Sequence, residues 1–545
     1  MPGANPLRRW PGALAALAWF LATSCLVLPV LNGEFQPLVD LPAHMARQYV
    51  LSNAGSGPLA SYYEYNFSLV PNAAVDALWA LLQATGIPLL RFTQLITVFY
   101  LLLFVAAPMV LARVLRGRWR IWPAASALLA YNACFYWGFQ NFIVTLPVAV
   151  LALALWFALE KQPVWCRALV FLPVAALTML MHLYAFLGLA LAVAGTEVQR
   201  ICDAPRKQRW PMLLPALLLA LPFLLVGGTE LVNLLNAPPN LNGGETEYGT
   251  LQRRLALPVQ IFLPPKWHEE PLVGLTSALA ALVSLLAVSS LLASRWLAHR
   301  PAPWPWLQLE PRLRGAVVWL FFASLLMPRL LNGVYYSDVR LPVILGMLLF
   351  GGTEWQQLRR NQALALTLLI TGILTLRGVA YDGLSSRYAA RIGELQQIAR
   401  AIPGGARVLA AAGTVPVAKK RLYWHTDAFL VMFAQAYVPT LFQGVHNFRV
   451  RAPWLKASVS QTDLVPVSLL SSPGQCAQEE YLRDWSRKYQ FLLVVDPGQT
   501  NLPASVASTL QQVTRHGENT LYRIVRMESA CPHPSVPDPA TRRNR

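Results

Sequence analysis

Residues 12–31 read GALAALAWFLATSCLVLPVL, an almost unbroken apolar run that directly follows Arg8 and Arg9. A helix needs about 20 apolar residues to cross the hydrocarbon core of a bilayer, and this run has that length. It is too long for the apolar region of a cleaved signal peptide, and it lacks a cleavage site of the small-x-small type. The run therefore predicts an uncleaved first membrane span.

The chain up to residue 377 repeats this pattern. Only 13% of the 545 residues are charged, whereas soluble domains carry about a quarter, so much of the surface must face lipid. Together with the first run, the apolar stretches predict about eleven membrane-spanning helices, at approximately 12–31, 92–113, 121–139, 141–159, 167–181, 183–198, 211–227, 272–294, 314–331, 340–353 and 361–377.

Basic residues give the orientation of these helices. If the N-terminus is cytoplasmic, every inside connection carries Arg or Lys, from the 113–120 connection to Arg359 and Arg360 before the last span. This bias is the positive-inside rule. Topology therefore explains much of the net charge of +19. The chain has no basic low-complexity run, so nucleic-acid binding is not expected.

Two long connections fall on the outside, at about 32–91 and 228–271. The first contains two stretches, 38–53 and 72–86, that predict amphipathic helices lying on the membrane surface. After the transmembrane domain (1–377), residues 378–545 become soluble. A helical period at 387–401 and apolar strands near 404, 489 and 521 predict a small α/β domain, followed by a disordered tail after Cys531.

The cysteines give few constraints. Cys25, Cys134, Cys166 and Cys202 lie in or beside apolar segments, and the chain has no CxxC pattern. Cys476 and Cys531 lie in the domain expected outside the cytoplasm, where a disulfide between them is chemically allowed; the pairing stays open. No DxD or HxxxH pair is present, so the residues predict no metal site.

Asp40 is the first candidate for chemistry, because it lies just after the first span at the expected lipid–water boundary. A carboxylate there can take a proton from a hydroxyl group. The alternative is a helix N-cap, since Asp40 is followed by Leu-Pro, and the two roles are compatible. His44, one turn later, either contacts Asp40 or a phosphate, or is a solvated residue. Glu34 is a weaker second carboxylate, interpreted as a surface charge.

Four further residues are candidates for binding a substrate. His182 separates two short spans, which predicts a break in a membrane helix that opens to an outside cavity. Asn141 ends one span and starts another, within a segment whose aromatic residues also suit an interfacial belt. Arg329 and Arg340 lie on the outside against the positive-inside trend, and a guanidinium suits a phosphate. The alternative for both arginines is snorkelling to the interface.

The layout resembles the GT-C superfamily of membrane glycosyltransferases, which use polyprenyl-phosphate sugars. The resemblance lies in the first span, the long outside loop with two surface helices and an early acidic residue, the many spans, and the outside α/β domain. More closely, four motifs are similar to those of uncharacterised bacterial membrane proteins with this architecture: Asp40-Leu-Pro-Ala-His44, Trp137-Gly-Phe-Gln-Asn141-Phe, His182-Leu-Tyr-Ala and Arg340.

This resemblance implies an inverting glycosyltransferase in the bacterial inner membrane, with its C-terminal domain periplasmic or extracellular. The enzyme would move a sugar from a polyprenyl-phosphate donor to an envelope glycan, lipid or protein. Asp40 would be the general base or a metal ligand, with the need for a divalent cation left open. His44, His182, Arg340, Arg329 and Asn141 would bind the substrate.

Two other classes of function fit the residues. One is a non-catalytic scaffold for an envelope assembly, and the other is a transporter of lipid or polysaccharide. Transporters usually contain internal repeats, and none is visible in this sequence. Convergence of Asp40, His182 and Arg340 on one outside cavity would favour the enzyme.

Overall fold

The computed structural model describes residues 11–53, 56–65, 71–236, 246–297, 305–331, 334–420, 423–441, 448–459, 464–470, 479–496 and 502–525. Within these ranges the chain divides into two compact units. The first unit comprises residues 11–41 and 71–389, and the second comprises residues 42–65 and 390–525.

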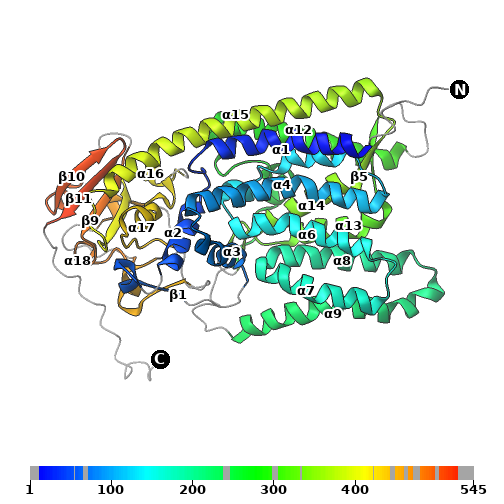
Figure 1. Cartoon of the computed structure of the whole chain (residues 1–545), viewed down its shortest axis with the longest axis horizontal. Coiled ribbons are helices and arrows are strands. Elements are labelled where there is room, and N and C mark those ends of the chain that lie inside the picture. The colour runs from blue at the N-terminus through cyan, green and yellow to red at the C-terminus, as the bar shows by residue number, and fades with distance from the viewer. Residues whose placement is uncertain are drawn as a thin grey trace. The chain divides into compact units, whose positions relative to one another are not determined.

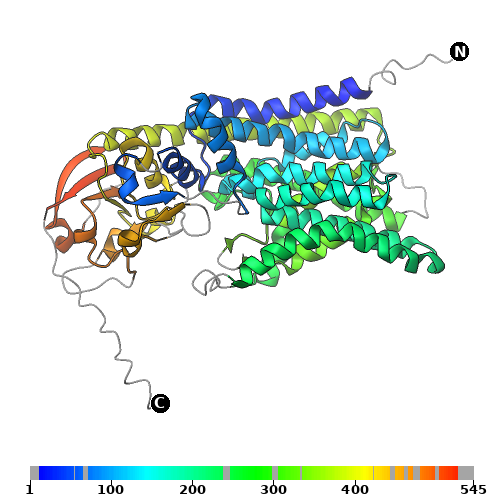
Figure 2. The same cartoon turned by 60° about the horizontal axis from the view of Figure 1, so that its bottom comes forward.

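The first unit is built from helices that run side by side (Figures 1 and 2). They are α1 (Pro11–Asn32), α3 (Ala74–Leu82), α4 (Leu89–Arg116), α5 (Ala133–Trp137), α6 (Gln140–Ala158), α7 (Val164–Met181), α8 (Leu183–Asp203), α9 (Arg206–Asn236), α11 (Leu251–Gln260), α12 (Pro271–Leu297), α13 (Arg314–Leu326), α14 (Arg340–Gly352) and α15 (Arg360–Ala399). In the described part of the chain, 8 helices are long and apolar enough to cross a membrane: α1, α4, α6, α7, α8, α9, α12 and α15. The protein is a multi-pass membrane protein.

Three of the predicted spans are not single long helices. The stretch predicted at 121–139 forms a 3-10 helix, η4 (Trp122–Leu129), and then the short α5. Pro123 opens η4, and Asn132 caps α5 by accepting a hydrogen bond from the Phe135 N–H at 3.0 Å. The spans predicted at 314–331 and 340–353 form α13 and α14, each of 13 residues. At 1.5 Å per residue these helices are shorter than the hydrocarbon core.

Small residues let some helices approach closely. A side chain on Gly195 of α8 would meet the backbone oxygen of Gly315 in α13 at 2.4 Å, and one on Gly315 would meet Gly195 in turn. Such small-residue crossings are a common packing device between membrane helices. The first unit also holds two strand pairs, β2 (Trp306–Leu309) with β5 (Thr353–Gln356), and β3 (Leu330–Leu331) with β4 (Val334–Tyr335).

The last helix is longer than expected. The span predicted at 361–377 and the soluble helix predicted at 387–401 form one continuous helix, α15, of 40 residues. No proline interrupts the sequence between them, so the backbone can stay helical where the composition turns polar. From residue 390 onward α15 belongs to the second unit.

The second unit contains the α/β fold that the sequence predicts. Its five-stranded sheet has the order β10-β11-β9-β6-β8, in which β6 pairs in parallel with β8 and β9, and the other neighbours are antiparallel. The predicted strands near 404, 489 and 521 correspond to β6, β9 and β11. The bounds are β6 (Val408–Ala412), β8 (Val465–Pro466), β9 (Phe491–Val495), β10 (Leu510–His516) and β11 (Asn519–Ile524).

Smaller elements complete the second unit. A second strand pair joins β1 to β7 in antiparallel register. The bounds are α2 (Leu41–Ser52), β1 (Tyr63–Tyr65), α16 (Val415–Ala418), α17 (Phe429–Ala434), β7 (Phe448–Val450), α18 (Trp485–Lys488) and α19 (Ala504–Ala507).

The two helices predicted in the first long loop are present as α2 and α3, but α2 does not have the solvated polar face expected of a surface helix. His44, Arg47 and Gln48 are all buried, so the interpretation of His44 as a solvated residue is wrong. The second predicted loop, 228–271, also contains more structure than expected, because α9 extends to Asn236 and α11 follows. Cys476 and Cys531, whose pairing the sequence leaves open, lie outside the described residues.

Candidate functional site

Arg340 and His182 lie in direct contact inside the first unit. Nη1 of Arg340, at the start of α14, is 3.1 Å from Nε2 of His182. Both side chains are buried, each about 5% exposed. Two residues that lie 158 positions apart in the sequence therefore meet, as expected if both serve one site.

His182 occupies the break that the sequence predicts. It ends α7 and caps α8, and its own backbone is extended (φ −168°, ψ 126°). The sequence predicts two short helices on either side of His182, but α7 has 18 residues and α8 has 21. The ring takes part in the cap, because Nδ1 accepts a hydrogen bond from the Tyr184 N–H at 3.1 Å.

The two contacts of the His182 ring cannot both be satisfied by a neutral imidazole. A neutral ring has one N–H and one acceptor nitrogen. If Nδ1 accepts from the Tyr184 N–H, the proton is on Nε2 and points at the Arg340 guanidinium, which has only donors. If Nε2 accepts from Arg340, the Nδ1–H opposes the Tyr184 N–H. In either tautomer one contact joins two donors, and an acceptor atom placed beside both would relieve it.

Aromatic rings surround the Arg340 guanidinium. Its carbon lies 4.5 Å from the ring centre of Phe139, 4.6 Å from that of Tyr184 and 5.4 Å from that of Phe142. Ring faces attract a cation, but they accept no strong hydrogen bonds. Nε of Arg340 is buried without a hydrogen-bond partner among the described residues, and Nη2 reaches only the Tyr335 carbonyl at 3.5 Å. The guanidinium therefore has donor capacity left for an anion.

The nearest acidic neighbour in the sequence is already paired. Arg253 donates from Nε to Oδ2 of Asp338 at 2.7 Å and from Nη2 to Oδ1 at 3.1 Å. This bidentate geometry is the strong form of an arginine–carboxylate pair. Arg253 of α11 thus neutralises Asp338. The charge of Arg340 must be balanced by another group.

Asp40 is held by the segment that also carries the rings beneath Arg340. The Asp40 N–H donates to the Trp137 carbonyl at 3.0 Å, and the Val39 N–H donates to the Tyr136 carbonyl at 3.1 Å. Gly138, with φ +75°, makes the approach possible, because a Cβ there would lie 3.1 Å from the Asp40 nitrogen. Asp40 immediately precedes α2, at the position expected for an N-cap.

The motif Trp137-Gly-Phe-Gln-Asn141-Phe therefore organises the site, although by residues other than the predicted one. The sequence interpretation chose Asn141, whose Oδ1 instead accepts from the Val75 N–H at 2.8 Å and so holds the first turn of α3. The sequence interpretation missed Gly138, which lies against the Asp40 backbone, and Phe139, whose ring centre lies 4.5 Å from the Arg340 guanidinium. Their signal was present in the motif, since a glycine between aromatic residues often marks a close backbone approach.

The remaining predicted residues lie elsewhere. Arg329 forms an ion pair with Glu247 at 3.6 Å, in the region where the β3–β4 hairpin meets residue 247. His44 belongs to the second unit, where it is buried on α2. Glu34 is exposed, as expected. Among the described residues no group of three or more His, Cys, Asp or Glu could hold a metal ion.

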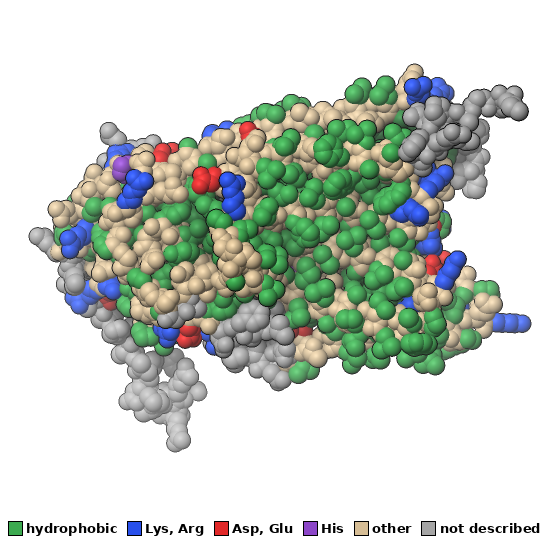
Figure 3. All heavy atoms as spheres, in the orientation of Figure 1, with side chains coloured by type: hydrophobic (Ala, Val, Ile, Leu, Met, Phe, Trp, Pro, Cys, Tyr) green, Lys and Arg blue, Asp and Glu red, His purple; other side chains and the backbone are tan. Residues whose placement is uncertain are grey.

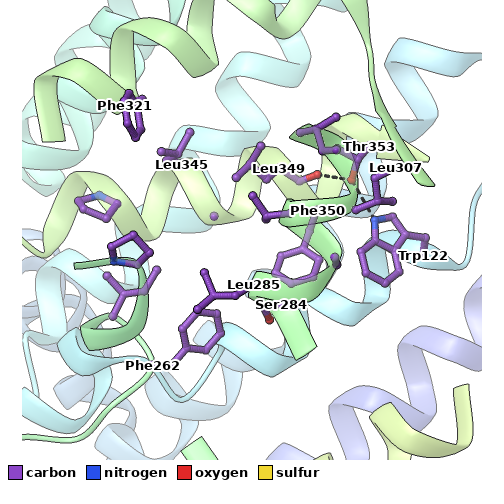
Figure 4. A pocket seen from close by; sticks show the side chains of 17 residues that line it. Trp122, Phe262, Ser284, Leu285, Leu307, Phe321, Leu345, Leu349, Phe350 and Thr353 are labelled. Atoms are coloured by element: carbon purple, nitrogen blue, oxygen red, sulfur yellow. Dashed lines mark hydrogen bonds between the residues drawn. The ribbon is translucent and has the colours of Figure 1, made fainter. Parts of the chain in front are cut away.

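An apolar cavity of about 180 Å³ lies along the other face of α14 (Figure 4). Pro342, Leu345, Gly346, Leu349 and Phe350 line it at the spacing of one helix face. Residues of α11, α12 and α13 line the opposite wall. At its far end Trp122 donates from Nε1 to the Thr353 hydroxyl at 3.0 Å. The cavity is shaped for an apolar chain rather than a polar ligand.

Comparisons with known proteins give a distant likeness. The sequence matches no known family model and no curated protein. Among solved structures, the chain is similar to the arabinofuranosyltransferase AftD from Mycobacteria, with 14% identity and a TM-score of 0.42 over 95% of this chain and 40% of that chain. The chain is also similar to a structure of the AftD mutant R1389S (class 2). This match has 15% identity and a TM-score of 0.39, and it covers 97% of this chain and 42% of that chain. The chain thus spans about two fifths of the length of these structures.

Proposed function

We propose that this protein is an inverting membrane glycosyltransferase that takes a sugar from a polyprenyl-phosphate donor and transfers it to an envelope acceptor. The proposal places Asp40, His182 and Arg340 at the outer face of a bacterial inner membrane, with the second unit outside the cytoplasm. The first two-thirds of the chain would hold the lipid-linked donor.

The donor conflict between His182 and Arg340 carries the proposal. A phosphate oxygen beside both groups could accept from the guanidinium and from the ring N–H at once. Charge-assisted bonds of this kind are short and strong, and the ring cage of Arg340 excludes water that would weaken them. The buried Nε, without a partner among the described residues, would supply a further donor.

The reaction then follows from the position of Asp40. The Asp40 carboxylate accepts the proton of an acceptor hydroxyl, whose oxygen attacks the anomeric carbon of the sugar. The bond between that carbon and the phosphate oxygen breaks on the opposite face, so the configuration inverts. The electron pair leaves with the polyprenyl phosphate, and Arg340 and His182 stabilise the negative charge that develops there.

The apolar cavity along α14 suits the polyprenyl tail. The first residue of α14 that lines the cavity is Pro342, in the first turn of the helix. Because Pro342 and Arg340 are two residues apart on a helix, their side chains lie on nearly opposite faces. A tail in the cavity would therefore pass over the N-terminal end of α14 to bring its phosphate to Arg340.

The experiment compares two carboxylates of the same loop. Cells that lack the protein are complemented with wild-type protein, Asp40→Asn or the control Glu34→Gln, and lipid-linked sugars and envelope glycans are measured by mass spectrometry. We expect Asp40→Asn to reach normal membrane levels but lower transfer by roughly a hundredfold or more, with donor accumulating. Glu34→Gln should behave as wild type, because Glu34 is exposed. Normal transfer by Asp40→Asn would overturn the proposal.

A further inference from the structure

A second apolar groove lies at the end of the first unit that the sequence predicts to be cytoplasmic. It has a volume of about 210 Å³ and is lined by α1, η4 and α15. Ala18, Leu21, Ala22 and Cys25 form the α1 wall, and Ala363 and Leu366 belong to the α15 wall. The small residues of α1 leave room between the helices for an apolar chain.

The rim of this groove is strongly basic. Leu358, which lines it, is followed by Arg359 and Arg360, both of them exposed at the start of α15. The first turn of α15 contains no acidic residue. The N-terminus of a helix already carries a partial positive charge, so two arginines there repel it, and an anion would offset the repulsion. Lys and Arg gather at this end of the hydrophobic face (Figure 3).

The acidic residues nearby are used by other arginines. Glu354 pairs with Arg116 at 3.4 Å, with Arg118 at 3.9 Å and with Arg120 at 2.5 Å. Glu310 also pairs with Arg116, at 3.5 Å. Because two carboxylates serve three arginines, this rim keeps a positive excess even before Arg359 and Arg360 are added.

Tryptophans mark the boundary between the apolar groove and the rim. Trp122 and Trp355 line the groove and contact each other edge to face, with ring centres 5.3 Å apart. Nε1 of Trp355 is buried without a hydrogen-bond partner among the described residues. Tryptophans favour the level of lipid headgroups, where an ester or phosphate oxygen could accept from this N–H.

We propose that the groove binds an anionic glycerophospholipid, with one acyl chain between α1 and α15 and the headgroup at Arg359 and Arg360. Charge complementarity selects this occupant, because basic pockets between membrane helices on the cytoplasmic side suit anionic headgroups. The site goes beyond the proposed transfer reaction and does not depend on it.

Native mass spectrometry of the purified full-length protein tests the proposal. The protein is incubated with equal amounts of dioleoyl phosphatidylglycerol and dioleoyl phosphatidylcholine, and bound lipid is counted. We expect the wild type to prefer phosphatidylglycerol. The double variant Arg359→Gln/Arg360→Gln should bind it roughly tenfold more weakly. The matched control is Arg206→Gln/Lys207→Gln, which removes two exposed charges at the start of α9 and should keep the preference.

A second pair of variants tests the groove itself. Ala363→Phe fills the α15 wall and should lower the binding of both lipids, whereas Leu364→Phe, on the exposed neighbouring position, should not. Equal binding of the two lipids by the wild type would overturn the proposal. So would equal losses in the 359/360 and 206/207 variants, because the attraction would then be a property of the whole basic surface.

Discussion

Two buried arginines of the first unit, Arg340 and Arg377, use their donors differently. Arg377, in the middle of α15, is 1% exposed. It donates from Nη1 to the Leu128 carbonyl and from Nη2 to the Tyr131 carbonyl, the latter at 2.7 Å. Nη2 also lies 3.5 Å from the Ser277 hydroxyl. Arg340, by contrast, directs Nη1 at a histidine ring, and its Nη2 reaches only the Tyr335 carbonyl at 3.5 Å. In both arginines Nε has no hydrogen-bond partner among the described residues.

We interpret this difference as that between a structural arginine and one that binds a ligand. The carbonyls of Leu128 and Tyr131 belong to η4 and the turn after it, where the backbone does not form a regular α-helix. Irregular backbone inside a membrane protein needs internal partners, and Arg377 supplies them. The protein itself provides backbone acceptors for both terminal nitrogens of Arg377. Arg340 has only the histidine ring and one carbonyl at 3.5 Å, and on our proposal a ligand supplies the further acceptor.

The largest expected effect is the loss of transfer in Arg340→Gln. This variant removes the charge that stabilises the leaving phosphate, so we expect the transfer rate to fall by about a hundredfold to a thousandfold. The melting temperature should stay the same or rise, because a buried charge that pairs with no carboxylate in the described part of the chain costs stability. A large drop in melting temperature with the same residual activity per folded molecule would make Arg340 a structural residue like Arg377.

The opposite pattern is expected for Arg377→Met. Without the guanidinium, the Leu128 and Tyr131 carbonyls lose their donor, and each unsatisfied carbonyl costs about 1–3 kcal/mol. The melting temperature of the purified protein should therefore fall by several degrees, while the transfer rate of the molecules that remain folded changes by less than about threefold. An unchanged melting temperature would contradict the structural role of the Arg377 hydrogen bonds to the Leu128 and Tyr131 carbonyls.

Gly138→Ala sharpens the comparison in residues 128–139, the segment that contacts both Arg377 and Arg340. The added Cβ would lie 3.1 Å from the Asp40 and Leu41 nitrogens, so the Asp40 backbone must shift. We expect transfer to fall by about tenfold. The control is Gly86→Ala, which has a similar φ of +78° but nothing within 4 Å of the added Cβ. If both variants lose activity equally, backbone strain rather than displacement of Asp40 is responsible.

The smallest effect is expected at the apolar cavity along α14. Ala287→Phe should fill part of the cavity and raise the KM for a long-chain donor a few-fold, with kcat nearly unchanged. Leu286→Phe is the matched control, because Leu286 is 62% exposed on the adjacent position. A KM that rises equally with a short-chain donor would show that the tail does not occupy this cavity.

The sequence predicts the parts of this structure that depend on composition along the chain. Long apolar runs locate the eight long helices, and apolar runs locate three strands of the second unit, β6, β9 and β11. The strands β1, β7, β8 and β10 were not predicted. Hydropathy cannot predict η4, because it reports only that residues 121–139 are apolar. It does not distinguish an α-helix from a 3-10 helix. The two carbonyls that Arg377 binds lie about 250 positions away. The sequence around Arg377 therefore does not indicate that it stabilises η4.

The site was predictable in part for the same reason. His182 and Arg340 stand out as polar residues in apolar surroundings, and the expectation that they bind one ligand remains a prediction consistent with their contact. Asn141 stands out equally, yet its amide oxygen is occupied by the Val75 N–H, a contact set by the tertiary fold. Arg329 similarly has Glu247 as a partner, which no local pattern indicates.

A cryo-EM map of the full-length protein with a bound polyprenyl phosphate tests the central claim most directly. The account predicts phosphate density within about 2.7–3.2 Å of both Arg340 Nη1 and His182 Nε2, with these two nitrogens farther apart than the 3.1 Å of the unliganded contact. A map in which that contact persists and the phosphate binds elsewhere would contradict the account.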